Sequence, residues 1–397
     1  MNGTNSTDRR NYRSLIIAGT GTIGTSLVSL GADLFSLFDH IYALDRNEKA
    51  LEPLQHSGIT CCCGDISDAG YVNTFLRQVP GPSLLVNLCA GTNNVRIRNS
   101  LAGHDTAYLD SCASMTDDPD ECRFSRLMPY TYSSIKTGLP HWLCWGINPG
   151  LVEIIARRML ATLTEKTCGY NVTVYEFDRL TGPDNQDKAA VGWCPEALVE
   201  EVMLAPTMVL ENGIPLEESG AGTRYCTVNW GSEAIPARVV GHEDIWNLAD
   251  IPAVRNGRFY YGLSPAVMEI LAMDNPKKAR DMLYIPRHGQ EITGLEQVAV
   301  QVDGRTMAAP RTMVWTEDHR ETWKRFGVNA VQYQTAKSLL LAIMLLQRTD
   351  YGFLPLSCSA SNLPISSRQW PLFEQFMEEL DINWQDGAAL NLHPLQE

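Results

Sequence analysis

The sequence predicts an α/β protein: an N-terminal Rossmann domain, which is a doubly wound parallel sheet, followed by a second α+β domain. Three observations predict it. Short apolar runs alternate with helical stretches from residue 14 to about residue 112. The first run leads directly into the glycine pattern of residues 19 to 24. Beyond Cys144 the pattern changes to mixed strands and helices, and 397 residues suit two domains.

In the first domain the β-branched and apolar runs predict five strands: Ser14–Ala18, Ile41–Leu44, Ile59–Cys62, Leu84–Leu88 and Ala107–Ser111. A helix is predicted from Thr22 to Phe38, because its apolar positions recur at three- and four-residue steps. Right-handed β-α-β connections then place the ligand crevice at the carboxyl ends of the strands.

The second domain is expected to begin after the loop Trp145–Gly150, with a helix over Leu151–Thr164. Further elements are predicted along the rest of the chain: strands at Val172–Phe177, Tyr225–Trp230 and Val298–Val302, and helices at Glu196–Met203, Pro265–Met273 and Thr335–Gln347. We therefore expect a Rossmann domain over residues 1–148, an α+β substrate or lid domain over 149–330, and a C-terminal helical segment over 331–397 that packs back on the Rossmann domain.

Composition excludes several classes of function. The net charge of −14 disfavours nucleic acid and anionic membranes as partners. The apolar run Leu339–Leu346 is too short to span a bilayer, and the N-terminus does not read as a signal peptide, so a cytoplasmic location is expected. Eleven cysteines without any C-x-x-C spacing indicate neither a disulfide framework nor a metal site. Hydrolase motifs (G-x-S-x-G, H-E-x-x-H and the P-loop) do not occur.

The segment Gly19-Thr20-Gly21-Thr22-Ile23-Gly24 is a G-x-G-x-x-G loop between a strand and a helix. In this context Gly19 makes the tight turn, Gly21 lets the backbone approach a pyrophosphate, and Gly24 allows close packing of helix on strand. The amides around Thr22 and Ile23 at the helix start then face the phosphates. A carboxylate 21 residues after Gly24, Asp45, suits the adenosine ribose and favours NAD, whereas Arg46 leaves NADP open.

The carboxyl ends of the next strands add four cofactor candidates. Asp65 and the Ile66 amide are expected near the adenine, with a simple turn cap as the alternative for Asp65. Asn87 and Cys89 end the fourth strand, which would place them beside the nicotinamide half. Cys89 and Cys112 are better explained as buried packing than as reactive thiols.

Four segments in order, GTGTIG, NLCAG, YLDSC and GINPGLV, resemble the saccharopine dehydrogenase-like superfamily and, within it, the homospermidine synthase branch. The resemblance implies a Rossmann domain, a second α+β domain and a C-terminal helix that returns to the first domain. It also implies bound NAD and a redox-neutral reaction, in which an amine is oxidised to an imine, exchanged with a second amine and reduced again.

The same resemblance implies roles for individual residues. Asn148 matches a polar active-site position, although it reads equally well as a helix cap. Trp193 matches a tryptophan that steadies a cationic iminium, and Glu176 would hold an ammonium group unless it is a plain strand-edge carboxylate. His288 and Glu291 resemble a His-x-Glu pair for proton transfer, but Gln290 stands at the matching position, so a solvated histidine is the alternative.

Two departures weaken the case for a diamine. Ala113-Ser114-Met115 replaces an acidic and an aromatic position, and LPLSCSASNLP replaces an acidic cluster. The substrate is then a monoamine, a modified polyamine or an amino acid, for which Arg224, Arg238 and Arg287 are available to a carboxylate. A saccharopine- or opine-type reductive amination of a 2-keto acid and a non-catalytic NAD-binding protein stay open as alternatives. A homodimer is the default expectation for a chain of this size.

Overall fold

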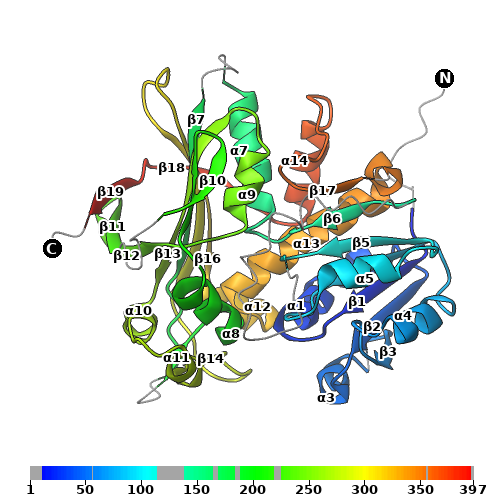
Figure 1. Cartoon of the computed structure of the whole chain (residues 1–397). Helices are drawn as coiled ribbons and strands as arrows, with labels where there is room; N and C mark the ends of the chain where they lie inside the picture. The colour runs from blue at the N-terminus through cyan, green and yellow to red at the C-terminus, as the bar shows by residue number, and fades with distance from the viewer. Residues whose placement is uncertain are drawn as a thin grey trace. The chain divides into compact units, whose positions relative to one another are not determined.

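The computed structural model describes residues 11–55, 57–113, 138–163, 169–183, 188–218, 225–354 and 356–394. The chain divides into two compact units (Figure 1). The first comprises Met1–Gly150 with Thr335–Asp381, and the second comprises Leu151–Gln334 with Ile382–Glu397. Helix α13 (Ala330–Arg348) begins in the second unit and continues into the first. The C-terminal part of the chain is thus shared between the units.

The first unit contains a seven-stranded sheet in the order β17-β6-β5-β4-β1-β2-β3, in which every pairing is parallel. Its strands are β1 (Ser14–Ala18), β2 (His40–Asp45), β3 (Thr60–Cys63), β4 (Ser83–Asn87), β5 (Thr106–Asp110), β6 (His141–Leu143) and β17 (Ser357–Ser359). The predicted Rossmann-type parallel sheet is confirmed, and the five predicted strands lie within a residue of their observed positions. Strands β6 and β17 have three residues each and carried too little pattern to be predicted.

Helices flank the first sheet: α1 (Thr22–Leu30), α2 (Ala32–Phe35), α3 (Glu48–Leu51), α4 (Ala69–Leu76), α5 (Asn94–Ser100), the later part of α13 and α14 (Trp370–Glu379). The single helix predicted for Thr22–Phe38 is wrong, because Gly31 interrupts it. The Gly31 N–H donates to the Leu27 carbonyl and closes α1 there. The buried side-chain amide of Gln347, on α13, forms hydrogen bonds with the backbone of Asn11 and Tyr12 just before β1.

The second unit contains a mixed ten-stranded sheet: eight strands in the order β18-β16-β15-β7-β13-β12-β11-β19, and the β9–β10 hairpin joined to β13. These strands are β7 (Tyr170–Asp178), β9 (Met208–Glu211), β10 (Ile214–Glu217), β11 (Tyr225–Trp230), β12 (Glu233–Val239), β13 (Val254–Leu263), β15 (Leu295–Asp303), β16 (Arg311–Asp318), β18 (Gln385–Gly387) and β19 (Asn391–Pro394). A two-stranded sheet joins β8 (Ala189–Ala190) and β14 (Leu283–Tyr284). The α+β character expected for this part of the chain is confirmed.

The helices of this unit are α7 (Leu151–Ala161), α8 (Pro195–Val199), α9 (Asp244–Ala249), α10 (Pro265–Leu271), α11 (Pro276–Met282) and α12 (His319–Phe326). Helix α7 contacts β15 and helix α9 contacts β13 (Figure 1). The helix predicted over Glu196–Met203 is α8 followed by one π-helical turn, Glu200–Leu204. A turn of this kind widens the backbone and re-aims side chains, often at functional sites.

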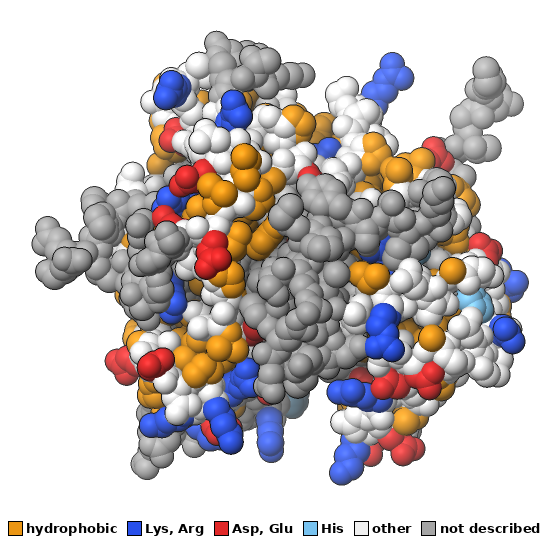
Figure 2. Space-filling view, viewed as in Figure 1, with side chains coloured by type: hydrophobic (Ala, Val, Ile, Leu, Met, Phe, Trp, Pro, Cys, Tyr) orange, Lys and Arg blue, Asp and Glu red, His pale blue; other side chains and the backbone are white. Residues whose placement is uncertain are grey.

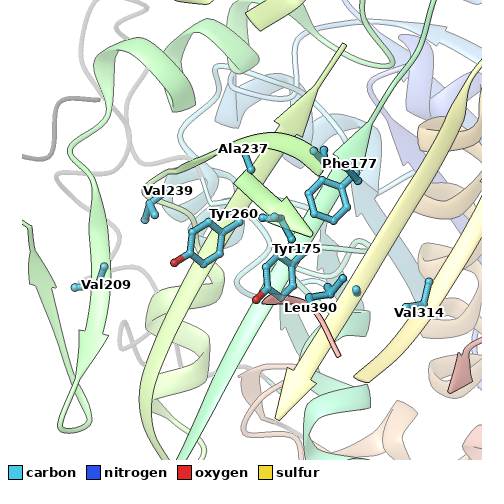
Figure 3. Close-up of a cluster of buried hydrophobic side chains, with 11 residues drawn as sticks. Tyr175, Phe177, Val209, Ala237, Val239, Tyr260, Val314 and Leu390 are labelled. Carbon is cyan, nitrogen blue, oxygen red and sulfur yellow. The ribbon is translucent and has the colours of Figure 1, made fainter. Parts of the chain in front are cut away.

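The large sheet presents chemically different side chains on its two faces. On one face Tyr175, Phe177 and Tyr260 pack in a buried hydrophobic cluster with residues of five further strands and the segment before β19 (Figure 3). Side chains alternate along a strand, so Glu176 and Asp178 point to the opposite face. Two buried acids between hydrophobic neighbours make that opposite face the candidate location of a functional site.

No helix within the described ranges is long and apolar enough to cross a membrane.

Candidate active site

The glycine loop of the first unit has the geometry of a dinucleotide-binding turn. Gly19 has φ +89°, and a Cβ there would lie 2.7 Å from the Leu88 carbonyl carbon. A Cβ on Gly24 would lie 2.1 Å from the Gly19 carbonyl oxygen. Two of the three glycines are therefore required by the protein's own backbone, since strands β1 and β4 and helix α1 meet too closely for side chains.

Gly21 differs from the other two glycines. A Cβ at Gly21 would have nothing within 4 Å, so the backbone is open to a ligand at this point. Gly21 is also the N-cap of α1, and no side chain caps the helix start at Thr22. Unused N–H groups at Thr22, Ile23 and Gly24, together with the positive end of the helix dipole, suit a pyrophosphate.

Asp45 ends β2 beside this loop. Its Oδ2 accepts hydrogen bonds from the Thr20 backbone N–H (2.8 Å) and hydroxyl (3.1 Å), and its Oδ1 accepts one from the Asn47 N–H (2.9 Å). Each oxygen of a carboxylate has more than one acceptor direction, so capacity for ribose hydroxyls is left. The next side chain, Arg46, is exposed. A carboxylate with an adjacent guanidinium fits either form of the cofactor.

Asp65 and Ile66 follow β3 in the same region. Asp65 accepts from the Ser67 hydroxyl and backbone N–H, and the hydroxyl bond is the main cause that lowers the pKa of Asp65. The turn-cap alternative therefore describes the Asp65 side chain. The Ile66 side chain is buried.

Hydrogen bonds within the protein hold Asn87 and Cys89 in place at the end of β4. The Asn87 amide donates to the Asn94 side chain and to the Tyr108 hydroxyl, both at 3.0 Å, and its carbonyl oxygen accepts the Cys89 N–H (3.2 Å). Burial, assisted by the charges of Asp45 and Asp65, raises the pKa of the Cys89 thiol to about 12. At neutral pH Cys89 is a protonated, unreactive thiol. Asn87 shapes the end of β4 through these bonds.

The second unit holds three buried carboxylates on the face of the sheet opposite the hydrophobic cluster. Glu176 and Asp178 lie on β7, and Glu296 of β15 stands directly opposite Asp178. Their exposed fractions are 6%, 3% and 1%. On the face of the molecule in Figure 2, basic and acidic side chains are interspersed. The three carboxylates on this face of the sheet, in contrast, lie in the interior.

Tyr261 and Trp193 border these carboxylates. Tyr261 of β13 lies beside Glu176 in the parallel pairing of β13 with β7. The half-buried Trp193 donates from its indole Nε1 to the Tyr261 hydroxyl (2.8 Å). Two residues expected to act on substrate, Trp193 and Glu176, are thus joined through Tyr261. An aromatic face beside buried carboxylates suits a cation.

A second acidic group lies close by. Glu201 of the π-helical turn, His242 and Glu243 bring one nitrogen and two carboxylate oxygens within 4.8 Å of one another, and all three residues are buried. The His242 ring stacks on Phe259 with centroids 4.1 Å apart. His242 Nδ1 lies 2.6 Å from Asp244 Oδ2.

The histidine of the first group points a ring nitrogen at an acid. His319 accepts the Ala330 backbone N–H at Nδ1 (3.2 Å), so the ring proton is on Nε2, which faces Asp178 Oδ1 at 3.1 Å. A nitrogen that carries a proton has no lone pair for a metal ion. The group around His319 therefore suits a hydrogen-bonding cation better than a bare metal ion, whereas Glu201, His242 and Glu243 offer three atoms that could also hold a metal ion.

Asp244 makes the stability of the protein dependent on pH. It is fully buried, and burial, together with the charges of Glu243 and Glu176, raises its pKa from 3.8 to about 8. Between these values the unfolded chain has lost the proton that the folded protein keeps, so stability falls as pH rises from about 4 to about 8. Asp244→Asn keeps the shape without the ionisation and is expected to remove that fall, which is on the order of 5–6 kcal/mol at 1.36 kcal/mol per pKa unit.

Urea unfolding of both proteins at pH 5, 6, 7 and 8 measures this effect. The matched control is Asp274→Asn, because Asp274 is exposed in the same unit. The control should follow the wild-type pH dependence. An equally steep fall in Asp244→Asn would contradict the assignment.

The other predicted residues lie elsewhere. His288 and Glu291 are exposed on the loop after β14, so neither belongs to the buried groups. The His288 ring faces Trp323 of α12 with centroids 6.3 Å apart. Asn148 belongs to the first unit, three residues before α7 begins at Leu151.

The arginines considered for a carboxylate do not form one group. Arg238 lies on β12 opposite Tyr261, and Arg287 lines a cavity of about 500 Å³ with Lys188, Tyr284, Ile285 and Gln290. Arg224, Ser114 and Met115 lie outside the described residues.

Sequence reasoning overlooked two signals for the buried groups. Asp178 stands two residues after Glu176 and directly follows the predicted strand Val172–Phe177, so one more residue of strand puts both acids on one face. His242-Glu243-Asp244 has the histidine-x-acid spacing of the pair that the family resemblance implies at His288. Both patterns are local and readable. Their meaning depends on Glu201 and Glu296, which only the fold brings near.

Comparisons with known proteins agree with this architecture. No protein-family model matches the sequence, and no curated protein sequence matches it. Among solved structures, homospermidine synthase from Legionella pneumophila in complex with NAD has a TM-score of 0.72 and 14% identity, over 96% of this chain and 91% of that chain. Saccharopine dehydrogenase (L-Glu forming) from Saccharomyces cerevisiae has a TM-score of 0.61 and 10% identity, over 96% and 100%.

The chain thus shares the fold of these two solved structures, and the predicted resemblance is confirmed at the level of the fold.

Proposed function

We propose that the protein is a homospermidine synthase-like, NAD-dependent oxidoreductase. It acts on the CH–NH bond of a substrate with more than one amino group, and the reaction passes through an imine. The observation that carries the proposal is the pair of buried acidic groups in the second unit, one around Glu176, Asp178 and Glu296 and one around Glu201, His242 and Glu243. Buried carboxylates beside an aromatic side chain suit a cation, and a substrate with two ammonium groups supplies one for each group.

The first unit fits the cofactor that this chemistry requires. The open backbone at Gly21 and the amides that start α1 would hold the pyrophosphate, and Asp45 would accept the ribose hydroxyls. Arg46 leaves NADP as an alternative. Bound NAD would supply a hydride acceptor and, later, a hydride donor.

The acidic residues bind the positive charge of the substrate, and the aromatic residues stabilise that charge. Glu176 and its neighbours pair with an ammonium group, and the Trp193 face stabilises the positive charge of an iminium by on the order of 1–2 kcal/mol when water is excluded. The hydrogen bond from Trp193 to Tyr261 fixes the indole plane. Trp193 is therefore a substrate-positioning residue next to the cationic centre.

Proton transfer is assigned to His242 and Asp244 in place of His288 and Glu291. Amine oxidation needs the neutral amine, and the exchange of one amine for another needs a proton to be delivered to the leaving nitrogen. His242 Nδ1 and Asp244 Oδ2, 2.6 Å apart, lie among the buried acids, whereas His288 and Glu291 are exposed.

A reductive amination of a 2-keto acid is the second candidate, and one observation favours it. The cavity lined by Lys188 and Arg287 presents two cations that suit a carboxylate. This reaction would consume reduced cofactor continuously, whereas the amine exchange proposed above returns its hydride.

The test is to incubate the protein with NAD and 1,4-diaminobutane, follow absorbance at 340 nm and analyse products by mass spectrometry. We expect little net NADH, release of ammonia and a triamine product formed from two diamines. 1-Aminobutane, with one ammonium group, should react at least tenfold more slowly. Steady consumption of NADH with a keto acid and an amino acid would favour the second candidate. Failure to bind NAD or NADH would contradict both.

A further inference from the structure

Helix α13 begins with a reciprocal cap formed by two buried amide side chains. Asn329 Oδ1 accepts the Gln332 backbone N–H (3.0 Å), and Gln332 Oε1 accepts the Asn329 backbone N–H (3.2 Å). This is the capping-box arrangement, which needs only an acceptor at each of the two positions. A serine at the first position and a glutamate at the second would cap the helix as well. The side-chain N–H groups of both amides are therefore not needed to start the helix.

Both of these amide groups donate to one carbonyl oxygen. Asn329 Nδ2 donates to the Gly192 oxygen (2.7 Å), and Gln332 Nε2 donates to the same oxygen (3.3 Å). The Gly192 N–H in turn donates to Asp178 Oδ2 (3.2 Å) at the end of β7. A Cβ at Gly192 would lie 2.5 Å from Val331 Cγ2 and 2.8 Å from Asp178 Oδ2. Hydrogen bonds on both sides and close packing against α13 and β7 thus fix the backbone of Gly192.

Gly192 directly precedes Trp193, whose indole is held at its far end as well. The indole Nε1 donates to the Tyr261 hydroxyl (2.8 Å). The Trp193 side chain is half-buried, and within the described parts of the chain no aromatic ring and no cationic group stacks on it. A ring that is held at both ends can receive a cation with little further loss of side-chain entropy. The position of the indole therefore depends on the bonds to Gly192 as well as on Tyr261.

We propose that Asn329 and Gln332 are positioning residues for the substrate: by fixing the Gly192 backbone, they hold the Trp193 indole where it meets the positive charge of the amine. Neither side chain touches the substrate, so a substitution of either one acts through Trp193. This inference rests on the proposed function, because that function places Trp193 beside the cationic centre. It adds that the start of α13 contributes to substrate affinity as well as to folding.

A double-mutant cycle with Trp193 tests the inference. Asn329→Ser keeps a good helix cap, but the shorter side chain does not reach the Gly192 oxygen. Trp193→Leu removes the aromatic face. Affinity for 1,4-diaminobutane is measured by calorimetry on NADH-saturated protein, so that no hydride can leave the amine. We expect Trp193→Leu to weaken binding by about 5- to 30-fold and Asn329→Ser by about 3- to 10-fold. In the Trp193→Leu background, Asn329→Ser should change the affinity by less than about twofold.

Asn275→Ser is the matched control, because the exposed Asn275 caps α11 in the same unit by accepting the Lys278 N–H (2.9 Å). It makes the same change at a helix start and should leave the diamine affinity unchanged. Gln332→Glu is a second variant, which keeps the acceptor of the capping box and removes the 3.3 Å bond to Gly192. Thermal unfolding shows which variants fold. Should Asn329→Ser not fold, Gln332→Glu decides, with an expected loss of about threefold that disappears in the Trp193→Leu background.

The outcomes separate this inference from the proposed function. Equal weakening by Asn329→Ser with and without Trp193, or wild-type affinity in Asn329→Ser, overturns the inference and leaves the amine chemistry standing. Wild-type affinity in Trp193→Leu overturns it too, since the indole would then have no part in binding the substrate. A wild-type protein that does not bind the diamine overturns the proposed function, and the inference with it.

Discussion

A Gly21→Ala variant is expected to fold like the wild type and to lose NAD affinity by roughly 10- to 100-fold. A Cβ at this position meets no protein atom within 4 Å, so the native packing is not disturbed. The added methyl group instead occupies the space in which the pyrophosphate must approach the backbone. Losing one hydrogen bond to a charged phosphate costs about 1.5–3 kcal/mol, which corresponds to the stated range.

Gly24→Ala is the matched comparison, since its Cβ would lie 2.1 Å from the Gly19 carbonyl oxygen. It should lower the unfolding free energy by about 1–3 kcal/mol, because the loop must move. Fluorescence titration with NADH and thermal unfolding of both variants separate the two effects. Wild-type NADH affinity in Gly21→Ala would refute the placement of the pyrophosphate on this loop.

The first unit was predictable because its signals are local. A buried strand at Ser14–Ala18, three glycines at fixed spacing and an acid at the end of β2 all lie within 32 residues. Each of them reports on the residues next to it in the sequence. The prediction of one long helix in this unit failed because Gly31 ends α1, although the apolar stripe continues past Gly31.

The buried acidic groups of the second unit were only partly predictable, because the pairing register of the strands decides which side chains become neighbours. Glu176 could be chosen from its place on a strand, but Glu296 becomes its neighbour only when β15 pairs with β7 in one particular alignment. A shift by one residue would turn Glu296 to the hydrophobic face. Likewise Glu201 reaches His242 through a π-helical turn that no residue pattern announced.

The structure and the family resemblance predict different proton-transfer residues, and two substitutions distinguish them. Exposed His288 has solvent on one side and Trp323 on the other. Buried His242 lies with Nδ1 2.6 Å from Asp244 Oδ2 and stacks on Phe259. We expect His242→Gln to lower kcat for 1,4-diaminobutane by 10²- to 10⁴-fold, the usual range for loss of a positioned acid–base group.

The His288→Gln variant should change kcat less than threefold, because a solvated side chain on a loop has no fixed geometry toward a buried amine. Binding of NADH reports on the first unit and should be the same in both variants, which shows that a loss in His242→Gln is not general unfolding. A steeper change of kcat with pH in the wild type than in His242→Gln would tie the loss to a titrating group. If His288→Gln is the inactive variant, the proton path runs through the exposed loop, and the buried pair of His242 and Asp244 serves to bind the cation without moving its proton.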